Sequence, residues 1–129
     1  MRVTHIDHIG VRVHDADRAL TFYGYFGFKL IAVAENEPIY VIRSEDGAEL
    51  NLVVNADAKG DNNILMDVTE KYPGITHVAL AVSSLEQSIV ELSSVGIEPS
   101  DGPMRLGTGT SVFYRDPDRN VVELRVEDA

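Results

Sequence analysis

The feature that most constrains the fold of this chain is an internal repeat of one strand design. Residues 7–13 and 74–82 both alternate apolar side chains with small or polar ones, which is the period-two pattern of a half-buried strand. On the other face of each stretch a histidine, His8 or His77, is followed two residues later by glycine or alanine. Small residues beside an imidazole leave space that a packed core would fill, so these faces are typical of a ligand pocket.

The repeat continues beyond these two strands. Candidate helix starts and the glycines that end the helices recur at the same offset of 69 residues. Near the ends of the two halves, residues 47–53 resemble residues 120–126, and matching the Glu-Leu pair in each stretch places Glu49 with Glu123 at an offset of 74 residues. A strand, a helix, a glycine stop and a closing strand that recur together indicate a duplicated supersecondary unit.

The chain is therefore predicted to have an α+β fold. One domain over residues 1–129 would contain two βαβββ modules, residues 1–54 and 75–129, joined by a polar linker over residues 55–74. In the first module we expect strands over residues 5–13, 28–34, 39–43 and 48–54, with a helix capped by Asp15 or Asp17. In the second we expect a strand from residue 75, a helix with a capping box at Ser83 and Glu86, a mobile loop or poor strand over residues 99–110, and strands over residues 111–115 and 121–126.

Composition excludes several classes of partner. The 129 residues carry a net charge of −10, which makes nucleic acid and anionic membrane surfaces unsuitable partners. There is no cysteine, so neither a disulfide framework nor thiolate chemistry is available. Residues 1–7 contain no long apolar run, and a cytoplasmic location is therefore expected.

Four residues of the repeat form a candidate metal site: His8, Glu49, His77 and Glu123. A carboxylate on the inner face of a strand is unfavourable by several kcal/mol unless it is paired or binds a metal. If the two modules pack by pseudo-symmetry, the four side chains converge. Two imidazoles and two carboxylates suit one divalent ion such as Zn, Ni, Co, Mn or Fe(II), and in an octahedral site they leave two positions open for two neighbouring substrate oxygens.

Three motifs point to one superfamily. They are residues 7–13 before one helix, residues 76–82 before the other, and the ending Asp-Pro-Asp-x-Asn-x-x-Glu-Leu over residues 116–124, in which Arg119 stands where glycine is common. With these motifs the chain resembles the vicinal oxygen chelate superfamily of glyoxalase I, extradiol dioxygenases, methylmalonyl-CoA epimerase and fosfomycin and bleomycin resistance proteins. The resemblance covers nearly the whole chain and implies that the two modules form a cupped, partly open mixed β-barrel around a metal site.

Within that superfamily the ligand set is most similar to that of glyoxalase I. This implies a metal-dependent lyase or isomerase of the lactoylglutathione lyase type, acting on a small carbonyl or thioester-derived substrate by enediolate chelation, with Glu123 or Glu49 moving the proton. It also implies substrate contacts from Arg12 and Arg105, and a glutathione adduct is one candidate substrate. Glyoxalase I has an asparagine four residues after its first glutamate, where this chain has valine; Asn51 is the substitute on the same face.

Two alternative functions stay open. Extradiol dioxygenases use two histidines and one carboxylate on Fe(II), and Glu49 as a second carboxylate would occupy a position that their chemistry needs open. Non-catalytic antibiotic-binding resistance proteins generally lack the metal ligands, although the acidic charge of this chain would suit a cationic drug. Either way we expect a homodimer, because an open half-barrel leaves sheet edges to cover and relatives are commonly dimers.

Overall fold

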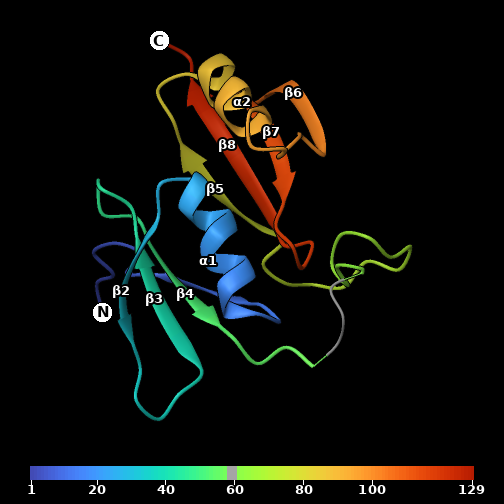
Figure 1. The fold of residues 1–129 in the computed structure, drawn as a ribbon. Coiled ribbons are helices and arrows are strands. Elements are labelled where there is room, and N and C mark those ends of the chain that lie inside the picture. Colours follow the sequence, from blue (N-terminus) through green and yellow to red (C-terminus); the bar gives the residue numbers. More distant parts are fainter. Residues whose placement is uncertain (58–60) are drawn as a thin grey trace. The chain divides into compact units, whose positions relative to one another are not determined.

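The computed structural model describes residues 1–57 and 61–129, and the chain divides into two compact units, Met1–Asp61 and Asn62–Ala129 (Figure 1). The division falls inside the predicted linker. Within the described ranges each unit contains one helix and one open four-stranded sheet, so the α+β class and the repeated βαβββ order are confirmed. The elements are β1 (Ile9–Arg12), α1 (Ala16–Tyr25), β2 (Lys29–Val33), β3 (Ile39–Arg43), β4 (Glu49–Val53), β5 (His77–Ala81), α2 (Leu85–Ser93), β6 (Asp101–Leu106), β7 (Gly109–Arg115) and β8 (Val121–Glu127).

The sheet of unit 1 has the order β1-β4-β3-β2, with β1 parallel to β4 and the other pairs antiparallel. Helix α1 begins after Asp15, whose carboxylate accepts a hydrogen bond from the Arg18 backbone N–H at 2.9 Å. Gly27 follows the helix at a φ of +91°, a conformation that glycine adopts without strain. Figure 1 shows α1 lying across one face of this sheet, and that face and the helix share the buried core of the unit. The core side chains include Ala19, Phe22, Tyr23, Phe28, Ile42, Leu50 and Leu52.

Unit 2 repeats this plan with the order β5-β8-β7-β6. Its helix begins one residue later than the predicted capping box, because the hydroxyl of Ser84, not of Ser83, accepts from the Gln87 backbone N–H at 3.1 Å. Of the two alternatives predicted for residues 99–110, the poor strand is confirmed, because β6 pairs with β7 with an irregularity between Asp101 and Met104. The core of this unit includes Val78, Leu92, Val112, Tyr114, Val122 and Leu124.

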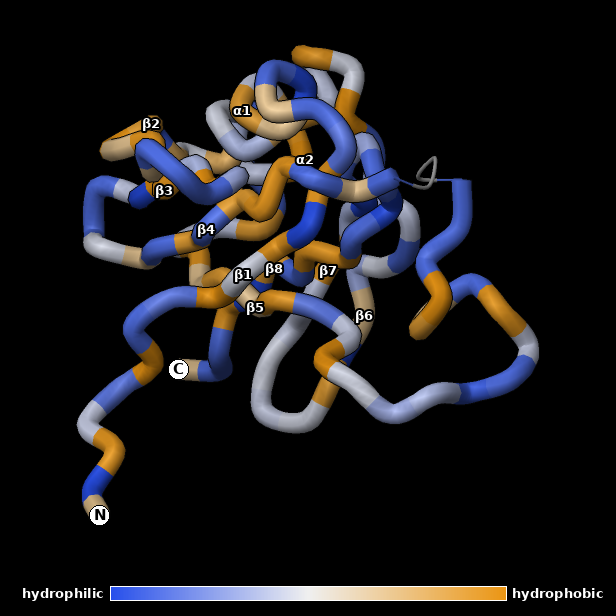
Figure 2. The backbone as a smooth tube through the Cα atoms, turned by 90° about the horizontal axis from the view of Figure 1, so that it is seen from below, coloured by the Kyte–Doolittle hydropathy of each residue, from blue (hydrophilic) through white to orange (hydrophobic). Residues whose placement is uncertain are grey.

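Alternation along the strands separates an apolar face from a polar face in each sheet. In β4 the buried Leu50 and Leu52 alternate with Glu49 and Asn51, and in β8 the same alternation leaves Glu123 on the polar face. The strand expected over residues 5–13 pairs only from Ile9 onward, and Figure 2 shows the preceding N-terminal segment carrying alternating hydrophilic and hydrophobic residues. Among the described residues no helix combines the length and the apolar character that crossing a membrane requires.

Candidate metal centre

The polar face of unit 2 brings two of the predicted ligands together. His77 opens β5 and Glu123 lies on β8, opposite Ala79 in the parallel register. The Nε2 atom of His77 is 3.0 Å from Oε1 of Glu123, and Glu123 is only 6 % exposed. A buried carboxylate requires partners for its oxygens, and this one has an imidazole on one side.

Two further side chains hold the other oxygen of Glu123. Ser111, which is fully buried on β7, donates its hydroxyl to Oε2 at 2.6 Å. Arg125 follows Glu123 by two residues on β8 and donates from Nη1 to the Ser111 hydroxyl at 3.1 Å. The same Nη1 atom lies 3.8 Å from Oε2 of Glu123. Both Ser111 and Arg125 were missed by the sequence analysis, although the period-two pattern already puts Arg125 on the face of Glu123.

The His77 ring is also held from behind. Its Nδ1 atom is 2.8 Å from the hydroxyl of Thr76, and its ring meets the edge of Phe113 with 6.1 Å between the ring centroids. Contacts of this kind to the second ring nitrogen fix the orientation of an imidazole, so that Nε2 points to a constant position. The pair His77–Glu123 is therefore a preorganised nitrogen and oxygen donor set.

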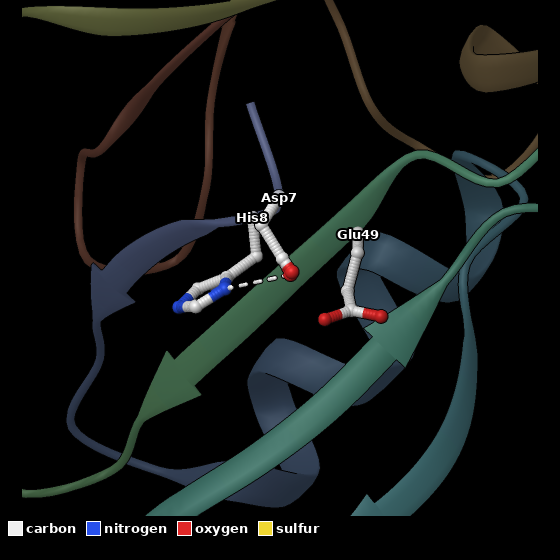
Figure 3. A group of neighbouring side chains, drawn as sticks. All are labelled: Asp7, His8 and Glu49. Atoms are coloured by element: carbon white, nitrogen blue, oxygen red, sulfur yellow. Dashed lines mark ion pairs between the residues drawn. The ribbon is translucent and has the colours of Figure 1, made fainter. Parts of the chain in front are cut away.

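Unit 1 also gathers an imidazole and carboxylates. Ligand atoms of Asp7, His8 and Glu49 all lie within 4.8 Å of one another, and Figure 3 shows the three side chains near the start of β1 and β4. Nδ1 of His8 is 3.7 Å from Oδ1 of Asp7, with the His8 side chain 43 % exposed. Glu49 is engaged by Arg43, which donates to Oε1 from Nε at 3.1 Å and from Nη2 at 2.7 Å.

The residues present fit a divalent ion. Each unit supplies one histidine beside at least one carboxylate, and neutral imidazole and carboxylate oxygen are common ligands of zinc and of other first-row divalent ions. The Glu123 carboxylate, buried and oriented by Ser111, is the better preorganised of the acidic donors.

The strand register corrects one expectation about these donors. Glu49 and Glu123 were expected at equivalent places in the two repeats. In unit 2 the residue opposite Glu123 is Ala79, which follows His77 by two; in unit 1 the corresponding residue, Gly10, stands opposite Asn51. Glu49 therefore lies two residues nearer the β3–β4 hairpin than the equivalent of Glu123.

The predicted substrate-binding residues lie in different settings. Arg12 is exposed at the end of β1 and donates from Nε to Oδ1 of Asn55 at 3.0 Å. Arg105 donates to both carboxylate oxygens of Asp128, at 2.5 and 2.9 Å, and this pairing raises the pKa of Arg105 and lowers that of Asp128. Arg105 is opposite Thr110, so it belongs to the face of its sheet that Glu123 does not share. The roles of Arg12, Arg105 and Asn51 with substrate stay predictions.

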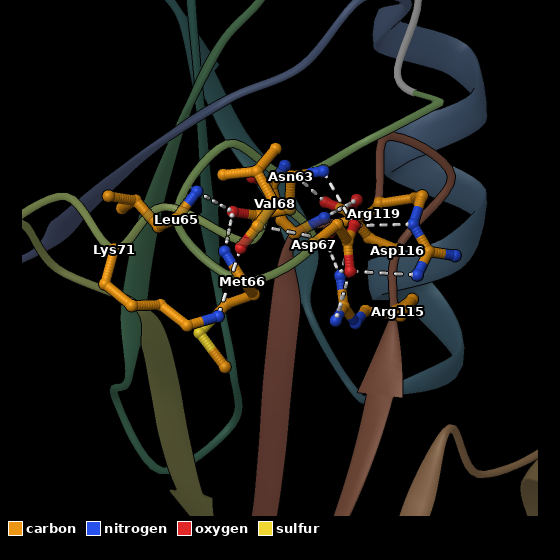
Figure 4. A network of polar contacts seen from close by, with 10 residues as sticks. Asn63, Leu65, Met66, Asp67, Val68, Lys71, Arg115, Asp116 and Arg119 are labelled. Carbon is orange, nitrogen blue, oxygen red and sulfur yellow. Dashed lines mark hydrogen bonds and ion pairs between the residues drawn. The ribbon is translucent and has the colours of Figure 1, made fainter.

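A second polar cluster in unit 2 was not found from the sequence. Figure 4 shows Asp67 between two arginines: Arg115 donates to it at 2.9 and 3.0 Å, and Arg119 donates at 2.8 and 3.3 Å. The hydrogen bonds from Arg119, followed by those from the Asn63 backbone and Arg115, hold the pKa of Asp67 well below its usual range despite burial. Arg119 has a φ of +66°, so the residue that departs from the usual glycine keeps the backbone conformation of glycine.

Comparison with known proteins settles the family. A family model described as the Glyoxalase/Bleomycin resistance protein/Dioxygenase superfamily matches residues 5–124. The chain belongs to this superfamily. Members of the superfamily generally bind a divalent metal and small-molecule ligands, and the nitrogen and oxygen donors described above agree with that property.

The individual proteins to which the chain is similar are named for different activities. The glyoxalase domain-containing protein RDO1 of Mycosarcoma maydis is 23 % identical over 96 % of this chain and 69 % of its own length. Biphenyl-2,3-diol 1,2-dioxygenase 3 of Rhodococcus globerulus is 40 % identical, over 43 % of this chain and 30 % of that protein. The crystal structure of TnmS3, an antibiotic-binding protein from Streptomyces sp. CB03234, has a TM-score of 0.76 at 22 % identity and covers 99 % of both chains, which shows the same fold.

Proposed function

We propose that this chain is a metal-dependent enzyme of the glyoxalase type, a lyase or isomerase that binds a small substrate through two neighbouring oxygens and moves a proton on it. The observation that carries the proposal is the pair His77–Glu123, in which a buried carboxylate oxygen lies 3.0 Å from an imidazole nitrogen. Three supporting side chains hold this pair in place, and such support is typical of sites where geometry matters for chemistry.

The proposed ligands are His77 and Glu123 from unit 2, and His8 with a donor on β4 from unit 1, for which the sequence predicts Glu49. A divalent ion bound by these residues would supply Lewis-acid stabilisation of the negative charge that develops on two adjacent substrate oxygens. Zn, Ni, Co, Mn and Fe(II) all accept such a mixed set of nitrogen and oxygen donors.

The chain's own part in the reaction is proton transfer and orientation. Ser111 donates to Oε2 of Glu123, so Oε1, which faces Nε2 of His77, is the oxygen proposed to receive a substrate proton. A base placed in this way contributes a factor of about 10²–10⁴ to the rate. Arg12, an exposed cation on the polar face of unit 1, would hold an anionic group of the substrate. A glutathione adduct is one such substrate, and a homodimer is the proposed assembly.

One observation favours a second candidate, an extradiol-type dioxygenase. The local identity to a dioxygenase named for biphenyl-2,3-diol is the highest of the comparisons described above. With two histidines and Glu123 as the only carboxylate, the donor set would match the facial triad of non-haem iron oxygenases. A catechol would then be the substrate and molecular oxygen the oxidant, with both oxygen atoms entering the product as a ring carbon–carbon bond breaks.

The experiment begins with metal analysis of protein purified without chelator. We expect about one divalent ion per chain, and loss of that ion in both His77→Ala and Glu123→Ala. Wild-type protein with no stoichiometric ion and no affinity for added Zn or Mn would contradict the proposal and favour an antibiotic-binding protein.

Loaded protein is then tested on hemithioacetals, acyl-CoA thioesters and catechols. Turnover of a hemithioacetal or a thioester that is lost in Glu123→Gln while the metal is retained supports proton transfer. Oxygen uptake with a catechol and Fe(II) instead assigns the protein to the dioxygenase class.

A further inference from the structure

Comparison of the strand registers in the two units shows which β4 residue corresponds to Glu123, without any alignment of the two sequences. In unit 2, Ala79 follows His77 by two residues and stands directly opposite Glu123 across the parallel β5–β8 pair. With this offset of two residues, Nε2 of His77 lies 3.0 Å from Oε1 of Glu123. The offset provides a rule that can be applied to the parallel β1–β4 pair of unit 1.

The same offset of two residues in unit 1 leads to the amide side chain of Asn51. Gly10 follows His8 by two residues and stands opposite Asn51, which occupies the place that Glu123 has in unit 2. The antiparallel neighbours agree, because Val41 stands opposite Asn51 as Phe113 stands opposite Glu123.

The hairpin ends of the two units give the same alignment. Arg43 stands opposite Glu49 in the last pair before the β3–β4 turn, and Arg115 stands opposite Val121 in the last pair before the β7–β8 turn. Glu49 therefore corresponds to Val121. Asn51, two residues further along β4, corresponds to Glu123.

The local environments of Asn51 and Glu49 point the same way. The Oδ1 atom of Asn51 is buried and has no hydrogen-bond partner within the part of the chain that the structure describes. A buried acceptor without a donor is unfavourable, and such an atom requires an explanation such as a bound cation or a hydroxyl group. Glu49 has its partner already: Arg43, 46 % exposed, donates two hydrogen bonds to Oε1.

We infer that Asn51, through its amide oxygen, and not Glu49, is the β4 residue that faces the ion and the chelating oxygens of the substrate. The inference rests on the proposed function, since it concerns the same centre. An amide oxygen carries no charge, so an ion bound through Asn51 keeps one more positive charge than an ion bound through the carboxylate of Glu49.

That residual charge specifies the class of substrate. An ion that keeps a positive charge favours a ligand that chelates as an anion, such as an enolate or a deprotonated catechol, over a neutral hemithioacetal. Glu49 is then free of any role as a base. Its pairing with Arg43 next to the β3–β4 hairpin is then a structural ion pair.

The rival arrangement is also present in unit 1, since the ligand atoms of His8, Glu49 and Asp7 lie within 4.8 Å of one another. His8 immediately precedes the first paired residue of β1 and its side chain is 43 % exposed, so its ring is less restrained than that of His77. The two arrangements predict opposite results for substitutions at residues 49 and 51.

The test is the affinity for Zn and Co(II), measured by competition with a chromophoric chelator, in wild type, Asn51→Ala, Asn51→Asp, Glu49→Gln and the control Glu35→Gln. Glu35 is an exposed carboxylate of the β2–β3 connection. We expect Asn51→Ala to weaken binding and Asn51→Asp to tighten it, each by about tenfold or more, since even indirect partners of ligands change affinity by about 10–100-fold. Glu49→Gln should match Glu35→Gln.

A tenfold loss in Glu49→Gln with Asn51→Ala unchanged overturns the inference while leaving the metal centre in place. Absence of binding in wild type overturns the proposed function itself, so the two failures are distinguishable. Circular dichroism of each variant establishes that its fold is retained. The visible spectrum of the Co(II) form gives a second readout, because exchange of an amide for a carboxylate ligand in Asn51→Asp changes its absorption bands.

Discussion

Replacing Arg119 by the glycine that is usual at this turn tests how Asp67 is held. Two effects oppose each other in Arg119→Gly. Glycine removes the left-handed backbone strain at φ +66°, which amounts to roughly 1–2 kcal/mol for a residue with a Cβ. It also removes the ion pair to Asp67, and because the Arg119 side chain is 41 % exposed this pair contributes about 0.2–1 kcal/mol. We therefore expect the free energy of unfolding to rise by roughly 0–2 kcal/mol, because the relief of strain equals or exceeds the loss of the ion pair.

Asp67→Asn is expected to have a much larger effect. The Asp67 side chain is only 13 % exposed, and its loss of charge leaves the half-buried guanidinium of Arg115 without its carboxylate. Breaking a fully buried pair costs about 3–5 kcal/mol, and the partial exposure here reduces the expected loss to about 2–3 kcal/mol. Because the arginines lower the pKa of Asp67 in the folded state, its stabilisation is fully present above the unfolded pKa near ~3.9 and is lost as the pH falls toward the folded pKa.

A double-mutant cycle separates the two effects at Arg119. In the Asp67→Asn background the ion pair is already lost, so Arg119→Gly should only relieve strain and should stabilise the protein by roughly 1–2 kcal/mol. The assay is urea denaturation followed by circular dichroism at pH 7, repeated at pH 3, where the gap between wild type and Asp67→Asn should narrow. Equal effects of Arg119→Gly in the two backgrounds would refute the claim that Asp67 holds Arg119 in this conformation.

Two further predictions concern buried groups of unit 2. Ser111→Ala removes the hydroxyl that donates to Glu123 and should lower the free energy of unfolding by about 1.5–3 kcal/mol, measured by urea denaturation; a loss below about 0.5 kcal/mol would contradict the assigned hydrogen bond. Burial, followed by the charge of Glu98, raises the pKa of Tyr114, so its stabilising effect is complete below the unfolded pKa near ~10 and is lost as the pH rises through the folded pKa. A titration of tyrosinate absorbance should show a late ionisation step that is lost in Tyr114→Phe, and removal of an early step instead would be the contrary result.

Hydrophobic periodicity predicted the fold because the rule that produces strands is local. Alternation of apolar and polar residues identified each of the β3, β4, β7 and β8 strands to within two residues, and the repeated helix and glycine stop identified the duplication. The same rule could not identify the β4 donor. A shift of the strand alignment by one residue moves every side chain to the other face of the sheet, but a shift by two residues returns each side chain to the same face. Glu49 and Asn51 therefore fit the alternating pattern equally well.

The cluster around Asp67 was missed for a different reason. Its carboxylate and the Arg119 guanidinium are 52 residues apart in the chain, and no local pattern links them. The available signal was the arginine itself. A residue with a Cβ at a turn position where glycine is usual requires a side-chain contact that compensates for the backbone strain, and the printed sequence contains that departure.

The two units show how a duplicated fold can keep one strand plan while its polar faces diverge. At the place where unit 2 has a buried carboxylate held by a serine, unit 1 has an amide whose oxygen is buried and unpartnered within the described residues. Two residues earlier on the same strand, unit 1 has the half-buried Glu49, paired with the exposed Arg43, where unit 2 has valine. A negative charge is tolerated in the buried position of unit 2 because Ser111 and Arg125 are there to stabilise it. The registers place Ile39 and Val53 at the corresponding positions of unit 1, so a second buried carboxylate would lack those donors. Asn51→Asp should therefore lower the stability of the metal-free protein while strengthening metal binding, a combination that a purely structural asparagine would not produce.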